Sequence, residues 1–116
     1  MIVHVTVRTP KLQESLEFYQ WLLDLPVASK LNTPTGDIYF LGAEETKFEL
    51  VEDSEAEKVN EENLFVGFLV EDLDQKLAML DSKKIPHTEI IAPEPNLRFA
   101  YFNDLNGCKI QLFERN

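Results

Sequence analysis

Two titratable side chains stand in segments of the chain that otherwise read as apolar strands. His4 lies in the alternating segment IVHVTVR (residues 2–8), and Glu49 lies between Phe48 and Leu50. A carboxylate in such a segment is costly unless it is paired or solvated. Glu49 could therefore act as a general base, or it could simply pair with a hydrogen-bonded His4.

The segment that contains Glu49 is written a second time near the end of the chain. Residues 49–52 read ELVE and residues 111–114 read QLFE, so the acid at the first position is replaced by Gln111. A displacement of 61 residues also matches apolar positions of an early helix-like segment to those of a later one, such as Leu12 to Leu73. Self-similarity at a nearly constant offset indicates a duplicated structural unit.

Hydrophobic periodicity predicts the same order of elements in each half of the chain. In the first half it predicts a strand, a helix and three strands, at residues 2–8, 10–24, 27–31, 36–42 and 46–52. In the second half it predicts a strand at 64–70, a helix from Asp72 that ends before Pro86, and strands at 87–92, 97–104 and 108–114.

Local signals mark the ends of several elements. Thr9 is a good N-cap and Pro10 a good first residue for the first helix. Asp72, with Gln75 three residues later, resembles a capping box. The Asn-Gly pair at residues 106–107 separates two apolar runs. It predicts a type I′ hairpin turn, because both central residues of that turn need positive φ.

These elements predict a single α+β domain of two βαβββ modules that form a cupped mixed sheet. The modules span about residues 1–52 and 63–116, with an acidic linker at about residues 53–62. In residues 52–62, six acids against one lysine give a charge of −5, half of the total. Such a charge run is typical of a solvated connector.

One helix in each module can cover only one face of its strands, so alternate strand positions remain on an uncovered face. Two such faces side by side would form a trough. The side chains expected to line it are His4, Glu49, Phe65, Gln111 and Phe113. Phe65 and Phe113 would offer flat surfaces to a planar ligand. Arg98 would either anchor an anion in the trough or sit at a strand edge.

Three segments of the chain are similar to those of the vicinal oxygen chelate (VOC) superfamily. VTVRTPKLQESLEFYQWLLDLPV resembles the first strand and helix of that family, VGFLVEDLDQKL resembles the opening of its second module, and FNDLNGCKIQLFE resembles its closing hairpin. The superfamily includes glyoxalase I, extradiol dioxygenases, fosfomycin-resistance enzymes and bleomycin-binding proteins. The resemblance implies the glyoxalase-like fold, which hosts several chemistries.

The resemblance also implies a metal site, which this chain matches only in part. Metal-using members of the family place ligands at the positions of His4, Glu49, Phe65 and Gln111. A phenylalanine cannot ligate, and an amide is a weaker ligand than a carboxylate. The expected function is therefore a bleomycin-resistance-like protein with a degenerate metal site, which binds a small hydrophobic or cationic molecule in the trough.

An enzyme remains the alternative to a binding protein. A metal-dependent lyase or dioxygenase of the glyoxalase type would use a divalent ion (Ni, Zn, Fe or Mn) held by His4, Glu49 and Gln111. Glu49 would then be a metal ligand or the catalytic base. Purified protein that contains a stoichiometric metal would favour this alternative.

Composition narrows the classes of partner. The 116-residue chain has a net charge of −10, which disfavours nucleic acid as a partner. No apolar run is long enough for a membrane span, and MIVHVTVRTP does not read as a signal peptide. A single cysteine, Cys108, fits a reducing compartment, so we expect a cytoplasmic protein. Exposed strand edges favour a homodimer.

Overall fold

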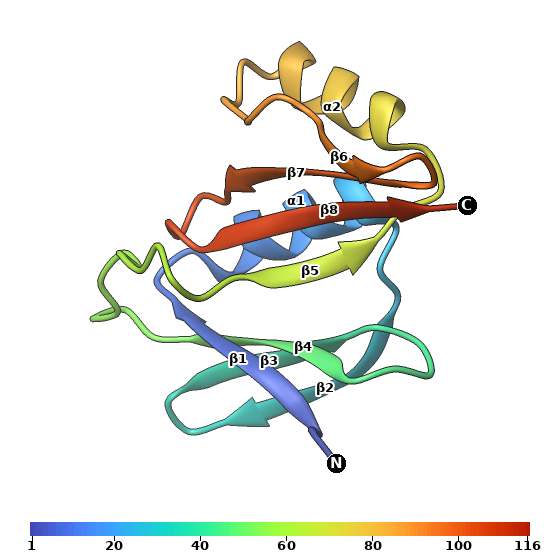
Figure 1. Ribbon diagram of the computed structural model, residues 1–116. Helices are drawn as coiled ribbons and strands as arrows, with labels where there is room; N and C mark the ends of the chain where they lie inside the picture. The colour runs from blue at the N-terminus through green and yellow to red at the C-terminus, as the bar shows by residue number, and fades with distance from the viewer. The chain divides into compact units, whose positions relative to one another are not determined.

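The computed structural model describes all residues, 1–116, and the chain divides into two compact units. The N-terminal unit is Met1–Lys58 and the C-terminal unit is Val59–Asn116. Both contain a strand, a helix and three further strands in that order (Figure 1). The predicted α+β class with two βαβββ modules is confirmed, and each module forms a four-stranded mixed sheet.

The N-terminal unit is a four-stranded sheet with one helix. Its elements are β1 (His4–Thr9), α1 (Leu12–Leu23), β2 (Val27–Thr33), β3 (Gly36–Leu41) and β4 (Lys47–Glu52). The strand order is β1-β4-β3-β2, with β1 parallel to β4 and the other pairs antiparallel. The first strand of the unit, β1, is therefore an edge strand, and its neighbour is the last strand, β4.

The apolar face of this sheet packs against α1. Leu16, Tyr19 and Leu22 recur at helical spacing and are buried. The ring of Tyr19 lies 4.8 Å from that of Phe48, centroid to centroid. Phe48 and its neighbour on the same face of β4, Leu50, are buried by this packing. Each such apolar side chain contributes about 1.5–3 kcal/mol on full burial.

The C-terminal unit repeats this plan. Its elements are β5 (Val66–Leu69), α2 (Leu73–Ser82), β6 (Ile91–Glu94), β7 (Leu97–Asn103) and β8 (Lys109–Arg115). The strand order is β5-β8-β7-β6, again with the first and last strands parallel and the other pairs antiparallel. Figure 1 shows α2 as a short helix that follows β5 directly.

Burial alternates along β8 and separates its two faces. Ile110, Leu112 and Glu114 are buried, whereas Lys109, Gln111 and Phe113 between them are only partly buried. The helix α2 supplies the apolar cover, with Leu73, Leu77 and Leu80 buried. The face opposite α2 is called the uncovered face below, and the same term is used for the face of the N-terminal sheet opposite α1.

The first helix begins later than its capping signals predict. It starts at Leu12 rather than Pro10, and Lys11 occupies the N-cap position without a side-chain hydrogen bond. Thr9 is the last residue of β1, and its hydroxyl accepts a hydrogen bond from the Lys11 amide at 2.9 Å. The threonine therefore closes the strand-to-helix turn instead of capping the helix itself, because parallel pairing of β1 with β4 extends to Thr9.

The predicted type I′ turn at residues 106–107 is wrong. Of the two residues only Gly107 has positive φ, at 80°. The carboxylate of Asp104 accepts hydrogen bonds from the amides of Asn106 and Cys108, both at 2.9 Å. This aspartate organises a longer turn and removes the need for Asn106 to adopt a left-handed conformation.

Three strand boundaries also differ from the predictions. The strand expected at 87–92 is β6 at Ile91–Glu94, and His87 forms only an isolated bridge to Phe102. β5 begins at Val66, so Phe65 lies immediately before it. β1 begins at His4. Neither helix is long and apolar enough to cross a membrane.

Candidate functional site

The uncovered face of the N-terminal unit carries a polar cluster of His4, Thr6 and Glu49, called the polar cluster below. Thr6 and Glu49 are direct partners in the β1–β4 register. The hydroxyl of Thr6 donates a short hydrogen bond to Oε1 of Glu49. Nε2 of His4 lies 3.4 Å from the same oxygen. Glu49 is only 8% exposed, and these two contacts compensate for its burial.

The polar cluster is a poor fit for the metal ion that metal-using family members hold. It supplies one imidazole and one carboxylate, and Oε1 of that carboxylate already meets both Thr6 and His4. No group of three or more His, Cys, Asp or Glu side chains is placed to hold a metal ion. Catalytic zinc sites normally use three protein ligands. The polar cluster supplies only two strong metal donors, which is fewer than such a metal site normally uses.

The uncovered face of the C-terminal unit carries aromatic rings instead. Phe65, Tyr101, Phe99 and Phe113 form a continuous series, called the aromatic surface below. The ring centroids of Phe65 and Tyr101 lie 5.1 Å apart, those of Tyr101 and Phe99 5.8 Å, and those of Phe99 and Phe113 6.1 Å. The last pair is stacked, with 11° between the ring planes. Only Phe65 and Phe113 of these four were identified from the sequence.

Gln111 belongs to the same face as the aromatic surface. Its Nε2 donates a hydrogen bond to the phenolic oxygen of Tyr101 at 3.1 Å. Its Oε1 lies over Gly67, where an added Cβ would come within 2.8 Å of it. The missing side chain at residue 67 therefore leaves room for the amide. Gln111 and Phe113 therefore lie on the same face of β8, as the sequence predicts.

Lys109 also lies on this face of β8, two residues before Gln111. Its ammonium lies 4.8 Å from the ring centroid of Tyr101 and 5.5 Å from that of Phe65. It also donates a hydrogen bond to the carbonyl of Glu62 at 3.3 Å. The available signal was its position two residues before Gln111, which puts both side chains on one face of β8.

A cavity of about 290 Å³ adjoins the aromatic surface, with which it shares Tyr101, and is also lined by Lys109. It is lined by Glu62, Pro86, His87, Thr88, Tyr101, Phe102, Asn103 and Lys109. Two hydrogen bonds hold its wall in place, from the Thr88 amide to the Tyr101 carbonyl at 2.9 Å and from the Tyr101 amide to the Thr88 hydroxyl at 3.0 Å. One backbone and one side-chain hydrogen bond therefore hold Thr88 against β7 in the cavity wall.

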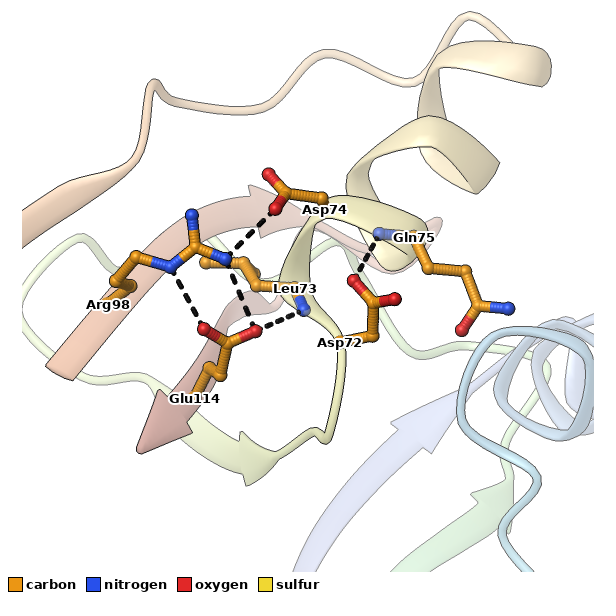
Figure 2. Close-up of polar contacts among 6 residues, drawn as sticks. All are labelled: Asp72, Leu73, Asp74, Gln75, Arg98 and Glu114. Carbon is orange, nitrogen blue, oxygen red and sulfur yellow. Dashed lines mark hydrogen bonds and ion pairs between the residues drawn. The ribbon is translucent and has the colours of Figure 1, made fainter. Parts of the chain in front are cut away.

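Arg98 lies on the face that α2 covers, away from Gln111 and Phe113. Figure 2 shows its guanidinium between Glu114 of β8 and Asp74 of α2. Nε donates to Glu114 Oε1 at 2.9 Å, and Nη2 donates to Asp74 Oδ2 at 3.0 Å. The structure thus gives Arg98 a place in an ion-pair cluster at the start of α2.

Glu114 is the centre of this cluster and was not recognised in the sequence. Its second oxygen accepts a hydrogen bond from the Leu73 amide at 2.8 Å, while Asp72 accepts one from the Gln75 amide at 3.0 Å (Figure 2). The hydrogen bond from Arg98, with the bond from Leu73, lowers the pKa of Glu114 below its usual value. Both acids satisfy amides that would otherwise be unpaired at a helix start.

Two further titratable groups have defined surroundings. His87 contacts the Thr88 carbonyl through Nδ1 at 2.7 Å and the Asp81 carboxylate through Nε2 at 2.8 Å. The backbone contact to Thr88 and the hydrogen bond to Asp81 outweigh partial burial and raise the pKa of His87. Burial, together with the nearby Asp104, raises the pKa of Cys108 to about 11. The thiol is therefore unreactive at neutral pH, as expected of a structural cysteine.

The fold, with its two βαβββ modules, is that of the family whose sequence pattern the chain matches. Residues 1–112 match the Glyoxalase/Bleomycin resistance protein/Dioxygenase superfamily. The chain belongs to this superfamily, which is the VOC superfamily that the sequence motifs resemble. No protein of curated function matches the sequence significantly.

Solved structures of low sequence identity share the fold over nearly the whole chain. A trypanothione-dependent glyoxalase I from Leishmania major aligns with a TM-score of 0.81 at 22% identity, over 98% of this chain and 86% of that one. A glyoxylase/bleomycin resistance protein/dioxygenase domain from Frankia sp. EAN1pec aligns with a TM-score of 0.80 at 17% identity, over 100% and 98%. A glyoxalase family protein from Enterococcus faecalis aligns at 0.76 and 18%, over 98% and 97%.

Proposed function

We propose that this VOC-superfamily protein binds a small planar molecule on the aromatic surface of its C-terminal unit. The observation that carries the proposal is the unbroken series of four rings on the uncovered face, at centroid separations of 5.1, 5.8 and 6.1 Å. Surfaces of this kind favour flat hydrophobic ligands, because ring contacts add about 0.5–1.5 kcal/mol each beyond the area that they bury.

Gln111 would orient such a ligand. Its Nε2 is engaged by Tyr101, so its Oε1 offers a hydrogen-bond acceptor beside the rings. Small-molecule sites commonly combine an apolar lining with a few placed polar groups. Phe65 is 40% exposed and lies at one end of the series, so it is the ring most accessible to a ligand.

The polar cluster of the N-terminal unit then has a structural role. Its carboxylate is paired with a hydroxyl and an imidazole, which offsets the cost of burying Glu49 in a strand. Together with the non-ligating Phe65 and the neutral Gln111, this supports a degenerate metal site. Homodimer formation and a cytoplasmic location remain predictions alongside this proposal.

A metal-dependent lyase or dioxygenase is the second candidate. The observation in its favour is the approach of His4 Nε2 to Glu49 Oε1 at 3.4 Å, which brings two suitable donor atoms together. A bound Ni, Zn, Fe or Mn ion would act as a Lewis acid toward substrate oxygen. The ion would need donors beyond these two side chains, so no reaction step is assigned to it.

Binding of an aromatic probe tests the first candidate. Calorimetric titration of the purified protein with naphthylmethanol should give a saturable isotherm, and Phe65→Ala should weaken it several-fold through loss of one ring. Leu64→Ala is the matched control, because Leu64 is the adjacent residue and is 74% exposed. Equal weakening in both variants, or no binding to the wild type, would overturn the proposal.

Metal analysis separates the two candidates. Elemental analysis of protein purified without chelators should find no stoichiometric Ni, Zn, Fe or Mn in the wild type. Glu49→Gln should then change neither metal content nor naphthylmethanol affinity. One equivalent of metal in the wild type that disappears in Glu49→Gln would replace the binding proposal with the enzyme.

A further inference from the structure

Lys109 has donor capacity that the protein does not use. An ammonium carries three donors, and the only hydrogen-bond acceptor of Lys109 is the Glu62 carbonyl at 3.3 Å. Oε2 of Glu62 lies 3.9 Å from the Lys109 ammonium, and the Glu62 side chain is 79% exposed. This ion pair is therefore weak. Lys109 is thus a cation with open donor positions beside the aromatic surface.

The lysine at the matching position of the N-terminal unit behaves differently. Lys47 opens β4 as Lys109 opens β8. Its ammonium donates to the carbonyls of Ala43 and Glu45 at 2.6 and 2.7 Å. Lys47 is therefore committed to its own loop, which leaves Lys109 as the member of the pair that could meet a ligand.

The cavity beside Lys109 is also lined by His87, whose imidazole is ion-paired with Asp81. Both ring nitrogens of His87 contact acceptor oxygens, of Thr88 and of Asp81, so the two contacts are satisfied together only when the imidazole is doubly protonated. The same contacts raise the pKa of this histidine. Because Asp81 balances the charge of protonated His87, Lys109 is the lining cation available to an anion, and Glu62 is the only acid in the lining.

The aromatic surface is already in contact with a cation of the protein. Lys109 lies within 6 Å of the ring centroids of Tyr101 and Phe65, at 4.8 and 5.5 Å, which is the range of cation–π attraction. A cationic ligand at these two rings would have to displace Lys109 or approach it against like-charge repulsion. An anionic ligand would pair with it while its apolar body stays on the rings.

We propose that the ligand of the C-terminal unit is an aromatic carboxylate, whose ring lies on the aromatic surface and whose carboxylate is bound by Lys109 in the adjoining cavity. This inference rests on the proposed binding function and specifies its ligand class. Of the two ligand types expected from the sequence, hydrophobic and cationic, the inference favours the hydrophobic one and adds a negative charge to it. A cationic ligand is disfavoured. Glu62 is the acid that the ligand would replace as the partner of Lys109.

Three probes with one ring system test the charge preference. Naphthoate, naphthylmethanol and naphthylmethylammonium are titrated calorimetrically into the intact protein. Naphthoate should bind about tenfold more tightly than naphthylmethanol, because hydrogen bonds to a charged group are the stronger kind. Naphthylmethylammonium should bind most weakly of the three.

Two charge variants give effects of opposite sign. Lys109→Gln should weaken naphthoate about tenfold and leave naphthylmethanol nearly unchanged. Glu62→Gln should tighten naphthoate a few-fold, since it removes a competing anion. Lys109→Arg should retain the preference for naphthoate. Lys58→Gln is the control, because Lys58 is exposed, is not a lining residue of the cavity and undergoes the same charge change.

The outcomes separate this inference from the binding proposal beneath it. If naphthylmethanol binds and responds to Phe65→Ala, but naphthoate gains nothing and ignores Lys109→Gln, the aromatic carboxylate is wrong and the binding surface stands. If none of the probes binds, the proposed function fails and the ligand class fails with it. A preference for naphthylmethylammonium that grows in Lys109→Gln would identify a cationic ligand instead.

Discussion

The two units share one backbone plan and differ most on the face that no helix covers. In each unit the first strand runs parallel to the last, and Thr6 pairs with Glu49 as Gly67 pairs with Gln111. Around this pair the N-terminal unit places an imidazole, from His4. The C-terminal unit places rings and an ammonium there.

The covered faces show the opposite behaviour. Leu50 and Leu112 occupy matching places on the last strands and both are fully buried. Leu16 and Leu77 match on the helices and are also buried. Packing density requires apolar side chains of similar volume at these positions. The covered faces therefore hold the fold, while the uncovered faces are free to carry different chemistry.

Two acids at matching positions near the ends of the last strands, Glu52 and Glu114, have different roles. Glu52 is exposed and accepts a hydrogen bond from the Asp37 amide at 3.0 Å. Glu114 is buried and joins Arg98 to the start of α2. Identical residue types at equivalent positions therefore stabilise a strand connection in one unit and a helix start in the other.

The largest effect is expected where the two units are most alike. Leu50→Ala and Leu112→Ala should each lower the free energy of unfolding by about 3 kcal/mol, through lost burial and the cavity left behind. Urea unfolding followed by circular dichroism measures this, with Leu64→Ala as an exposed control that changes it by less than about 0.5 kcal/mol. If one leucine tolerates the change and its counterpart does not, the two cores are not equivalent.

A smaller effect is expected from glycines with different surroundings. Gly107→Ala should cost about 2 kcal/mol, because residue 107 has φ of 80° and a Cβ there would meet the Val59 carbonyl oxygen at 2.4 Å. Gly67→Ala meets only the end of the flexible Gln111 side chain. It should unfold at nearly the wild-type urea concentration, and a loss as large as that of Gly107→Ala would contradict this reading.

The ion-pair cluster should make the C-terminal unit sensitive to acid. Because the pKa of Glu114 is lowered in the folded state, its contribution is present above the pKa of the unfolded chain and is lost as pH falls through the folded value. Arg98→Met should therefore destabilise the protein at about pH 7, and the destabilisation should shrink as the pH falls below the usual pKa range of a glutamate. Glu52→Gln is the matched control, and an equal pH dependence in it would assign the effect elsewhere.

His87 should give the smallest effect, with the opposite sign in pH. Its pKa is raised on folding, so its stabilising contribution is full below the unfolded pKa and disappears as pH rises through the folded value. The difference in thermal midpoint between the wild type and His87→Gln should be larger at about pH 5.5 than at about pH 9. A constant difference would mean that the Asp81 and Thr88 contacts do not depend on charge.

Much of the architecture could be predicted because its signals are local. The leucine spacing of both helices, the alternation of the strands and the Asp72–Gln75 signal all correspond to features of the structure. The hairpin at residues 106–107 could not, since a carboxylate two residues upstream decided the turn. The start of α1 could not either, because strand pairing competed with capping at Thr9.

For the candidate site, the sequence predicted only which side chains share a face of the sheet. Period-two alternation placed Gln111 and Phe113 together, and the structure adds Phe99 and Tyr101 from the neighbouring strand. Their register depends on the β7–β8 hairpin, which the residue pattern of one strand does not report. The alternative roles of Arg98 stayed open in the sequence for the same reason, and the structure pairs it with Glu114 across that register.

The sequence by itself determined the duplicated βαβββ order and the apolar faces, because periodicity and turn chemistry act between residues close in the chain. Only the tertiary structure decided that Lys109 lies over two rings, that Glu114 holds Arg98, and that Thr6 pairs with Glu49. These contacts join residues that are 8 to 44 positions apart in the chain. Their formation follows from strand register and packing, which arise only when the whole unit folds.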